Sequence, residues 1–186
     1  MNVSKGCRFI VQAFLFAGLI GVARVEACSC GVTCKNQSEC VKQAFANASV
    51  VFIGTAVEVT FQNGDDKPGP YSLSAANYRV RLKVNEPFKG LTASEVVSNN
   101  GPGGGADCSY GKMEQGRDYL IYASFNDART EIVPIPCSRT RPINAETLPD
   151  FPNGSVTDEM RLRANRAMDK ELRLLRSLKK KLHSEH

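Results

Sequence analysis

Three residues near the N-terminus, Cys28-Ser29-Cys30, combine two thiols with a position that makes an α-amine available for chemistry. They directly follow a segment typical of a secretory signal peptide, and cleavage after Ala27 would make Cys28 the first residue of the mature chain. A disulfide would then hold the Cys28 side chain while its α-amine stays free. A rigidly held amine and carbonyl on one residue form a bidentate group that can chelate a metal ion.

The segment before this triplet, residues 1–27, has the features of a signal peptide. Lys5 and Arg8 form a basic start, residues 9–23 are almost entirely apolar, and Val25-Glu26-Ala27 approximates a cleavage site. The apolar run has about 15 residues, fewer than the roughly 20 that a membrane-spanning helix needs. We therefore expect a secreted, extracellular protein without a membrane span. The alternatives are an uncleaved anchor and a bacterial lipoprotein, in which acylation would block the amine.

The cysteines of the mature chain predict disulfides. Six remain once the signal peptide is removed, and an even number in a secreted chain indicates three bridges, for which fifteen pairings are possible. They are Cys28, Cys30, Cys34, Cys40, Cys108 and Cys137. A structural zinc site is the alternative, but the chain lacks C-x2-C pairs, and its two histidines, His183 and His186, are close to the C-terminus.

Charge and the placement of polar residues argue against several classes of function. The histidines are in the C-terminal tail and the carboxylates are scattered, so no Ser-His-Asp or Cys-His arrangement is visible and we expect no enzyme. Residues 158–183 carry nine Lys/Arg against four Asp/Glu, and the rest of the mature chain is slightly acidic. We therefore expect no nucleic-acid partner and no cofactor of the protein's own.

Most of the mature chain has the pattern of a β domain. Residues 77–88 alternate, with Tyr78, Val80 and Leu82 on one face and charged residues on the other, which predicts an antiparallel strand with one buried face. The other strand candidates are residues 49–61, 94–98, 118–124 and 130–134, the last two forming a hairpin around Asn126-Asp127. Five short strands suit a mainly β fold, an OB-like Greek-key barrel, with an open sandwich as the alternative.

A change of period follows residues 141–154, which are rich in Pro and Asn and are expected to form a linker. Apolar residues then recur every three or four positions, at Met160, Ala164, Met168, Leu172, Leu175, Leu178 and Leu182. Together with a possible capping box at Ser155 and Asp158, they predict a C-terminal amphipathic α-helix over residues 155–183. The helix either binds acidic polysaccharide or membrane through its basic face, or packs on the barrel with a solvated outer face.

Several short motifs stand in a characteristic order along residues 28–140. They are Cys28-Ser29-Cys30, Ala48 to Gly54, Phe88-Lys89-Gly90, Cys108-Ser109-Tyr110 followed by Tyr119 to Ala123, and Cys137-Ser138. Together they resemble the tissue inhibitor of metalloproteinases (TIMP) family, which is built on the netrin-like (NTR) module. The resemblance implies an OB-like barrel with a flanking helix, in agreement with the strand count.

The resemblance also implies a disulfide framework. It pairs Cys28 with Cys108 and Cys30 with Cys137, which leaves Cys34–Cys40 as the third bridge. This third bridge departs from the family, whose inhibitory domain uses a later cysteine that this chain lacks.

The function implied by the resemblance is inhibition of zinc metalloproteinases. The Cys28 amine and carbonyl would coordinate the catalytic zinc of the protease and displace its water, so zinc would enter only through the bound protease. Ser29 would point into the main specificity pocket, and Cys30, Gly31, Ala106 and Asp107 would complete the contact surface. The alternative is a non-inhibitory extracellular NTR binding module.

Overall fold

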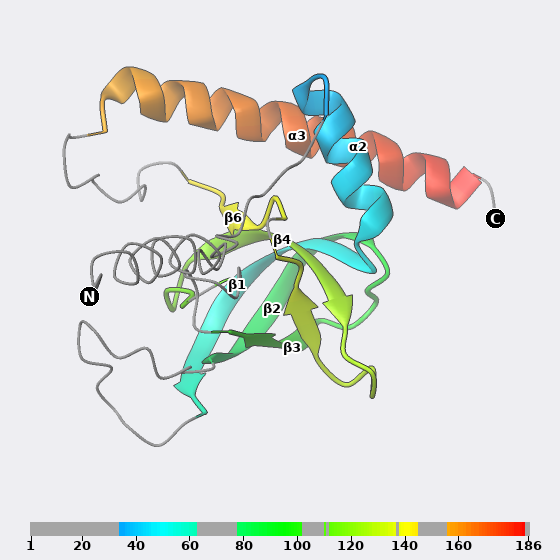
Figure 1. Ribbon diagram of the computed structural model, residues 1–186, viewed down its shortest axis with the longest axis vertical. Helices are drawn as coiled ribbons and strands as arrows, with labels where there is room; N and C mark the ends of the chain where they lie inside the picture. The colour runs from blue at the N-terminus through cyan, green and yellow to red at the C-terminus, as the bar shows by residue number, and fades with distance from the viewer. Residues whose placement is uncertain are drawn as a thin grey trace, which may run out of the picture.

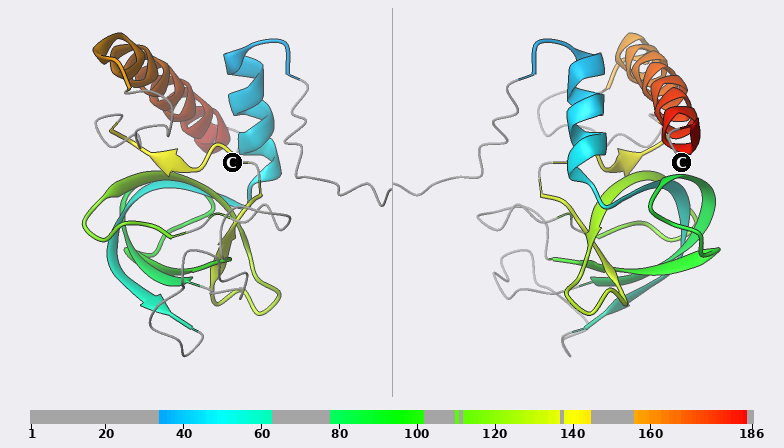
Figure 2. Two further views of the ribbon diagram at one scale, coloured as in Figure 1. Left: turned by 60° about the vertical axis from the view of Figure 1, so that its left-hand side comes forward. Right: turned by 90° about the vertical axis from the view of Figure 1, so that its right-hand side faces the viewer.

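The structure, a computed structural model, describes residues 34–62, 78–101, 110, 112–136, 138–144 and 156–184. The helices and strands within them are α2 (Gln37–Asn47), β1 (Val50–Phe61), β2 (Tyr78–Lys89), β3 (Glu95–Asn100), β4 (Asp118–Phe125), β5 (Ile132–Pro134), β6 (Arg141–Pro142) and α3 (Asp158–Ser184). The strands curl into a barrel, and α2 and α3 lie together on one side of it (Figures 1 and 2).

The barrel closes because β1 pairs with both β2 and β4. The strand order is β1-β2-β3-β5-β4, and β4 returns to β1. All these pairs are antiparallel except β3 and β5, which run parallel where Ser98 pairs with Ile132. The predicted five-stranded OB-like barrel with a C-terminal helix is confirmed, and the open sandwich is wrong.

The predicted hairpin between β4 and β5 is present, and Asn126 explains its turn. The Asn126 side-chain oxygen accepts hydrogen bonds from the backbone amides of Thr130 and Glu131, at 2.9 and 3.2 Å. Arg129, within the turn between Asn126 and Thr130, adopts a positive φ of 56°. A short polar side chain that bonds its own following backbone is a common way to close such a loop.

Apolar side chains on both faces of the barrel wall are buried, which creates two core layers. One layer fills the barrel and includes Val50, Phe52, Val80, Leu82, Met113, Ile121 and Ile132. The other lies between the barrel and the helices and includes Val41, Phe45, Val51, Phe88, Leu120, Tyr122, Met168, Leu172 and Leu175. Because β1 and β4 contribute to both layers, they read as nearly continuous apolar runs, whereas β2 alternates over its first half.

The C-terminal helix differs from its prediction at the N-terminal end. It begins at Asp158, directly after Thr157, whose hydroxyl accepts a hydrogen bond from the backbone amide of Met160 at 3.3 Å, and the predicted cap Ser155 lies outside the described residues. The apolar stripe packs on the core only from Met168 onward, and Met160 is half exposed. The expected linker also differs, since its first two residues pair with β4 as β6.

Helix α2 was not predicted from the sequence pattern, which shows no strong period over residues 28–48. Its N-cap is Asn36, whose side-chain oxygen accepts a hydrogen bond from the backbone amide of Glu39 at 3.0 Å. Only Val41 and Phe45 of the helix are buried. Two apolar residues one turn apart are too weak a pattern to identify a helix without its tertiary contacts.

Candidate functional site

The residues predicted to contact a protease lie outside the part of the chain that the structure describes. They are Cys28, Ser29, Cys30, Gly31, Ala106 and Asp107, and the cysteines expected to bridge to them, Cys108 and Cys137, lie outside it as well. The third expected bridge is within the described residues. Cys34 and Cys40 form a disulfide with their Cα atoms 5.3 Å apart, as predicted. The described residues nearest to these positions in the sequence are anchored to the fold at several points.

The N-terminal end of α2 is the first of these anchors. The disulfide links Cys34, which precedes the helix, to Cys40 within it, and the Cys40 amide bonds the carbonyl of Asn36 at 3.1 Å. The Glu39 carboxylate accepts a hydrogen bond of 3.1 Å from the amide of Lys35. Since capping bonds and a disulfide act on the same turn, the chain is held in place where the described part begins.

The C-terminal end of α2 is held by β2. The Lys89 ammonium group donates hydrogen bonds to the carbonyls of Phe45, Ala46 and Ala48, at 2.8, 3.1 and 2.6 Å. It also lies 5.3 Å from the centre of the Phe45 ring. Burial lowers the pKa of Lys89. A cation at this position satisfies carbonyls that the helix leaves unpaired and interacts favourably with the helix dipole.

The two residues beside Lys89 complete the link between β2 and α2. Phe88 is buried in the core layer under the helices. Gly90 has a φ of +68°, and a Cβ atom there would overlap the carbonyl oxygen of Ser49, just before β1. The Phe88-Lys89-Gly90 motif therefore has a structural role at each position.

The segments next to the other expected cysteines also attach to the barrel. The amide of Ile135 donates to the carbonyl of Tyr122 at 3.1 Å, and the amide of Ser138 donates to the carbonyl of Ile135 at 3.0 Å, so both flanks of position 137 are held. Tyr110, two positions after Cys108, packs on the barrel core with its ring edge-on to Tyr119. Burial raises the pKa of Tyr110.

Helix α3 is fixed to the barrel by a buried carboxylate. Glu171 has a fully buried side chain that receives hydrogen bonds from the guanidinium groups of Arg139 and Arg141 and from the Tyr122 hydroxyl. Burial alone would raise the pKa of Glu171, but the two arginines outweigh burial and lower it. An ionised carboxylate is thus stable inside this interface because it is fully paired.

Helix α3 in turn contacts α2. The side-chain amide of Gln37 in α2 donates a hydrogen bond of 2.9 Å to the backbone carbonyl of Ala167 in α3. The two helices and the barrel share one core layer. The α2 segment, which leads back to the N-terminal cysteines, is therefore supported by α3 as well as by the barrel.

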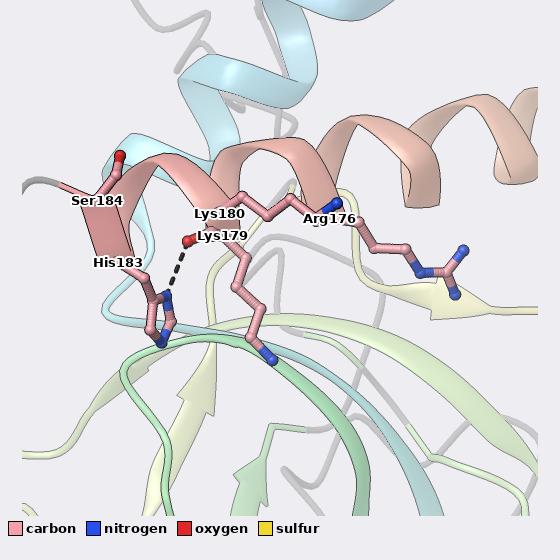
Figure 3. Close-up of a pocket in the computed structure, with 5 residues that line it drawn as sticks. All are labelled: Arg176, Lys179, Lys180, His183 and Ser184. Atoms are coloured by element: carbon pink, nitrogen blue, oxygen red, sulfur yellow. Dashed lines mark hydrogen bonds between the residues drawn. The ribbon is translucent and has the colours of Figure 1, made fainter.

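A second surface of interest lies at the C-terminal end of α3. A hollow of about 580 Å³ is lined by Arg176, Lys179, Lys180, His183 and Ser184. The side chains of Lys179 and His183 reach from the helix toward the barrel (Figure 3). Arg176 forms a two-pronged ion pair with Glu86 of β2, and this pair lowers the pKa of Glu86.

Neither a metal-binding cluster nor a membrane-spanning helix is present among the described residues. These residues contain no group of three or more His, Cys, Asp or Glu side chains that could hold a metal ion. No helix among them is both long enough and apolar enough to span a membrane.

No protein-family model matches the chain, and no curated protein matches it.

Proposed function

We propose that this protein is a secreted, TIMP-like inhibitor of zinc metalloproteinases that chelates the catalytic zinc of the protease through the amine and carbonyl of Cys28. The observation that carries the proposal is the closed OB-like barrel, in which α2 joins the described disulfide Cys34–Cys40 to the barrel wall. The barrel is the kind of scaffold that the TIMP resemblance implies, whereas the Cys34–Cys40 bridge is a departure from that family.

The anchoring of α2 limits the distance between the chelating group and the fold. Cys28 is six positions before Cys34, and six residues span at most about 20 Å, so the amine is tethered close to the start of α2. The proposed bridges from Cys28 to Cys108 and from Cys30 to Cys137 would shorten this tether further. A group that is ordered before binding loses little entropy when it reaches the zinc, which favours tight association.

The proposed chemistry is displacement of the zinc-bound water, which is the nucleophile of the protease. The Cys28 amine must be neutral to donate its lone pair, and an α-amine with a pKa of about 7.7–8 is partly neutral at neutral pH. Ser29 would enter the main specificity pocket, where its small side chain favours breadth over affinity. Gly31, Ala106 and Asp107 would contact the protease beside it.

The decisive experiment changes only the Cys28 amine. One form of the protein is the mature chain, shown by intact mass to begin at Cys28, and the other has a removable N-terminal extension. The extension converts the amine into an amide, which is a poor zinc ligand. We expect both forms to melt at the same temperature, and only the first to inhibit a panel of zinc proteases.

Removal of the extension is the matched control, because it regenerates the amine in the same protein sample. Recovery of inhibition would assign the activity to the amine rather than to a folding defect. Equal inhibition by the extended and the trimmed forms would exclude zinc chelation by Cys28.

The second candidate is a non-inhibitory NTR binding module. The observation that favours it is the cationic hollow at the end of α3, whose described lining residues all belong to that helix. Absence of inhibition by the trimmed form toward every zinc protease tested would make this candidate the better one.

A further inference from the structure

The C-terminal half of α3 presents only positive charge to solvent. Residues 170–184 contain six Lys/Arg, namely Lys170, Arg173, Arg176, Lys179, Lys180 and Lys181, and all are at least partly exposed. The single acidic residue in this stretch, Glu171, is buried against the barrel and paired there with Arg139 and Arg141. This half of the helix therefore buries its one acidic side chain, Glu171, against the barrel and exposes its basic side chains to solvent.

Part of this charge surrounds the hollow described above. Arg176, Lys179 and His183 lie three and four positions apart, about one turn each, Lys180 is the neighbour of Lys179, and a turn advances about 5.4 Å along the helix. The Nδ1 atom of His183 lies 2.9 Å from the Lys179 carbonyl, which orients the ring beside the lysine (Figure 3). The hollow thus has a row of polar and cationic groups along one wall.

The cations of the hollow are only partly neutralised. Arg176 forms an ion pair with Glu86, and the positive charge of Lys179 also contributes to lowering the pKa of the Glu86 carboxylate. Among the described residues, no acidic side chain forms an ion pair with Lys180 or Lys181. An uncompensated row of cations beside a concave surface attracts anionic ligands.

We propose that this hollow and the adjoining basic face of α3 bind a linear anionic polysaccharide that carries sulfate or carboxylate groups. A chain with repeated negative charges matches cations spaced along a helix better than a compact anion does. The described residues that line the hollow all belong to α3, so the inference does not depend on protease inhibition by Cys28.

The structure favours a polysaccharide over a membrane or a nucleic acid. Leu174, Leu178 and Leu182 pack on the core layer between α3 and the barrel, so this half of the helix has no free apolar face to insert into lipid. The described residues that line the hollow include no Phe, Tyr or Trp on which bases could stack.

The test uses the full mature protein and a heparin octasaccharide as the probe, with affinity measured by calorimetry over a range of salt concentrations. Lys179→Ala and Lys180→Ala are combined in one variant. Arg163→Ala and Arg166→Ala form the matched control, since they remove the same charge from exposed positions of the same helix outside the hollow. Alanine is a good helix former, so we expect both variants to keep the wild-type melting temperature.

We expect the Lys179/Lys180 variant to bind the octasaccharide about tenfold more weakly. The slope of log affinity against log salt concentration should become shallower by roughly two, one for each lysine removed. The control should change affinity by no more than about threefold, because its cations lie outside the hollow. In the wild-type protein, the octasaccharide should also protect Lys179 and Lys180 from amine-acylating reagents, while Lys42 of α2 stays reactive.

Three results would overturn the proposal. Equal losses in the two variants would indicate diffuse charge attraction rather than a site. No binding by the wild-type protein, or no protection of Lys179 and Lys180, would exclude the site. Tighter binding to phosphatidylserine vesicles or to duplex DNA than to heparin would assign the surface to one of those partners instead.

Discussion

The hydroxyl group of Tyr122 on β4 donates a hydrogen bond of 2.8 Å to the carboxylate of Glu171 on α3. Burial and the neighbouring negative charge of Glu171 raise the pKa of Tyr122, so the phenol stays protonated and remains a donor. Arg139 and Arg141 approach the same carboxylate from the chain after β5. This cluster connects the basic helix α3 to the barrel through Glu171, the one buried acidic residue among those that the structure describes.

We expect Glu171→Gln to lower the free energy of unfolding by about 3 kcal/mol, because two partly buried arginines would lose their counter-charge. Chemical denaturation followed by circular dichroism measures this loss. Glu86→Gln is the control, since it removes another Arg–carboxylate pair in a much more exposed setting, and should cost at most about 1 kcal/mol. Equal losses in the two variants would contradict the special role of the buried cluster.

The contribution of Glu171 should depend on pH. Its pKa in the folded protein is below the ordinary value of 4.5, so the unfolded chain binds a proton more readily than the folded chain. The stabilisation is therefore complete above the ordinary value and is lost as the pH falls through the folded-state pKa. We expect the stability difference between wild type and Glu171→Gln to be largest near neutral pH and to shrink in acid. A difference that grows on acidification would contradict the assignment.

We expect Lys89→Met to destabilise the protein by about 1–2 kcal/mol, because three carbonyls at the end of α2 lose a charged donor. Hydrogen exchange should be faster at the Ala48 amide, which bonds the Ala44 carbonyl in the last turn. Lys83→Met on the same strand is the control, since Lys83 is exposed, and should leave that amide unchanged. An unchanged exchange rate of the Ala48 amide in Lys89→Met would show that Lys89 contributes little to the stability of the last turn of α2.

Gly90→Ala should cost more than Gly116→Ala, although both glycines have positive φ angles, of 68° and 83°. An alanine in this backbone region costs about 1–2 kcal/mol wherever it is placed. At Gly90 the new methyl group also overlaps the Ser49 carbonyl, whereas nothing lies within 4 Å of it at Gly116. The difference between the melting temperatures of the two variants measures the destabilisation caused by the steric overlap at Gly90. Equal melting temperatures would refute the close approach of Gly90 to Ser49.

Non-reducing peptide mapping should find Cys28 linked to Cys108, Cys30 linked to Cys137, and Cys34 linked to Cys40. Any other pairing of Cys28, Cys30, Cys108 and Cys137 would remove the proposed support of the Cys28 amine. Loss of the Cys34–Cys40 bridge, by replacing both with alanine, should cost about 2 kcal/mol because its loop is short. Loss of either long-range bridge should cost about 4–5 kcal/mol by the same loop-entropy argument.

The sequence by itself determined the barrel strands and the C-terminal helix. The alternation around Tyr78 and Val80 predicts one buried face for β2, and the structure buries that face in the barrel. The apolar repeat from Met168 to Leu182 predicts the packing face of α3. These features are local, since a period of two or of three to four residues directly reports which side of an element meets the core. The cysteines of the candidate site were identified from sequence alone, and the pairing of Cys34 with Cys40 agrees with the expected framework.

Only the tertiary structure decided the existence of α2 and the role of Glu171. The helix α2 has few apolar residues, and its stability comes from distant partners, among them Lys89 and the Ala167 carbonyl. In the sequence, Glu171 is one acid within a basic helix, and nothing local distinguishes it from a solvent-exposed residue. Arg139 and Arg141 are some thirty positions away and meet it only after α3 has packed on the barrel. Contacts between residues so far apart depend on the closed fold, and a local periodicity cannot report them.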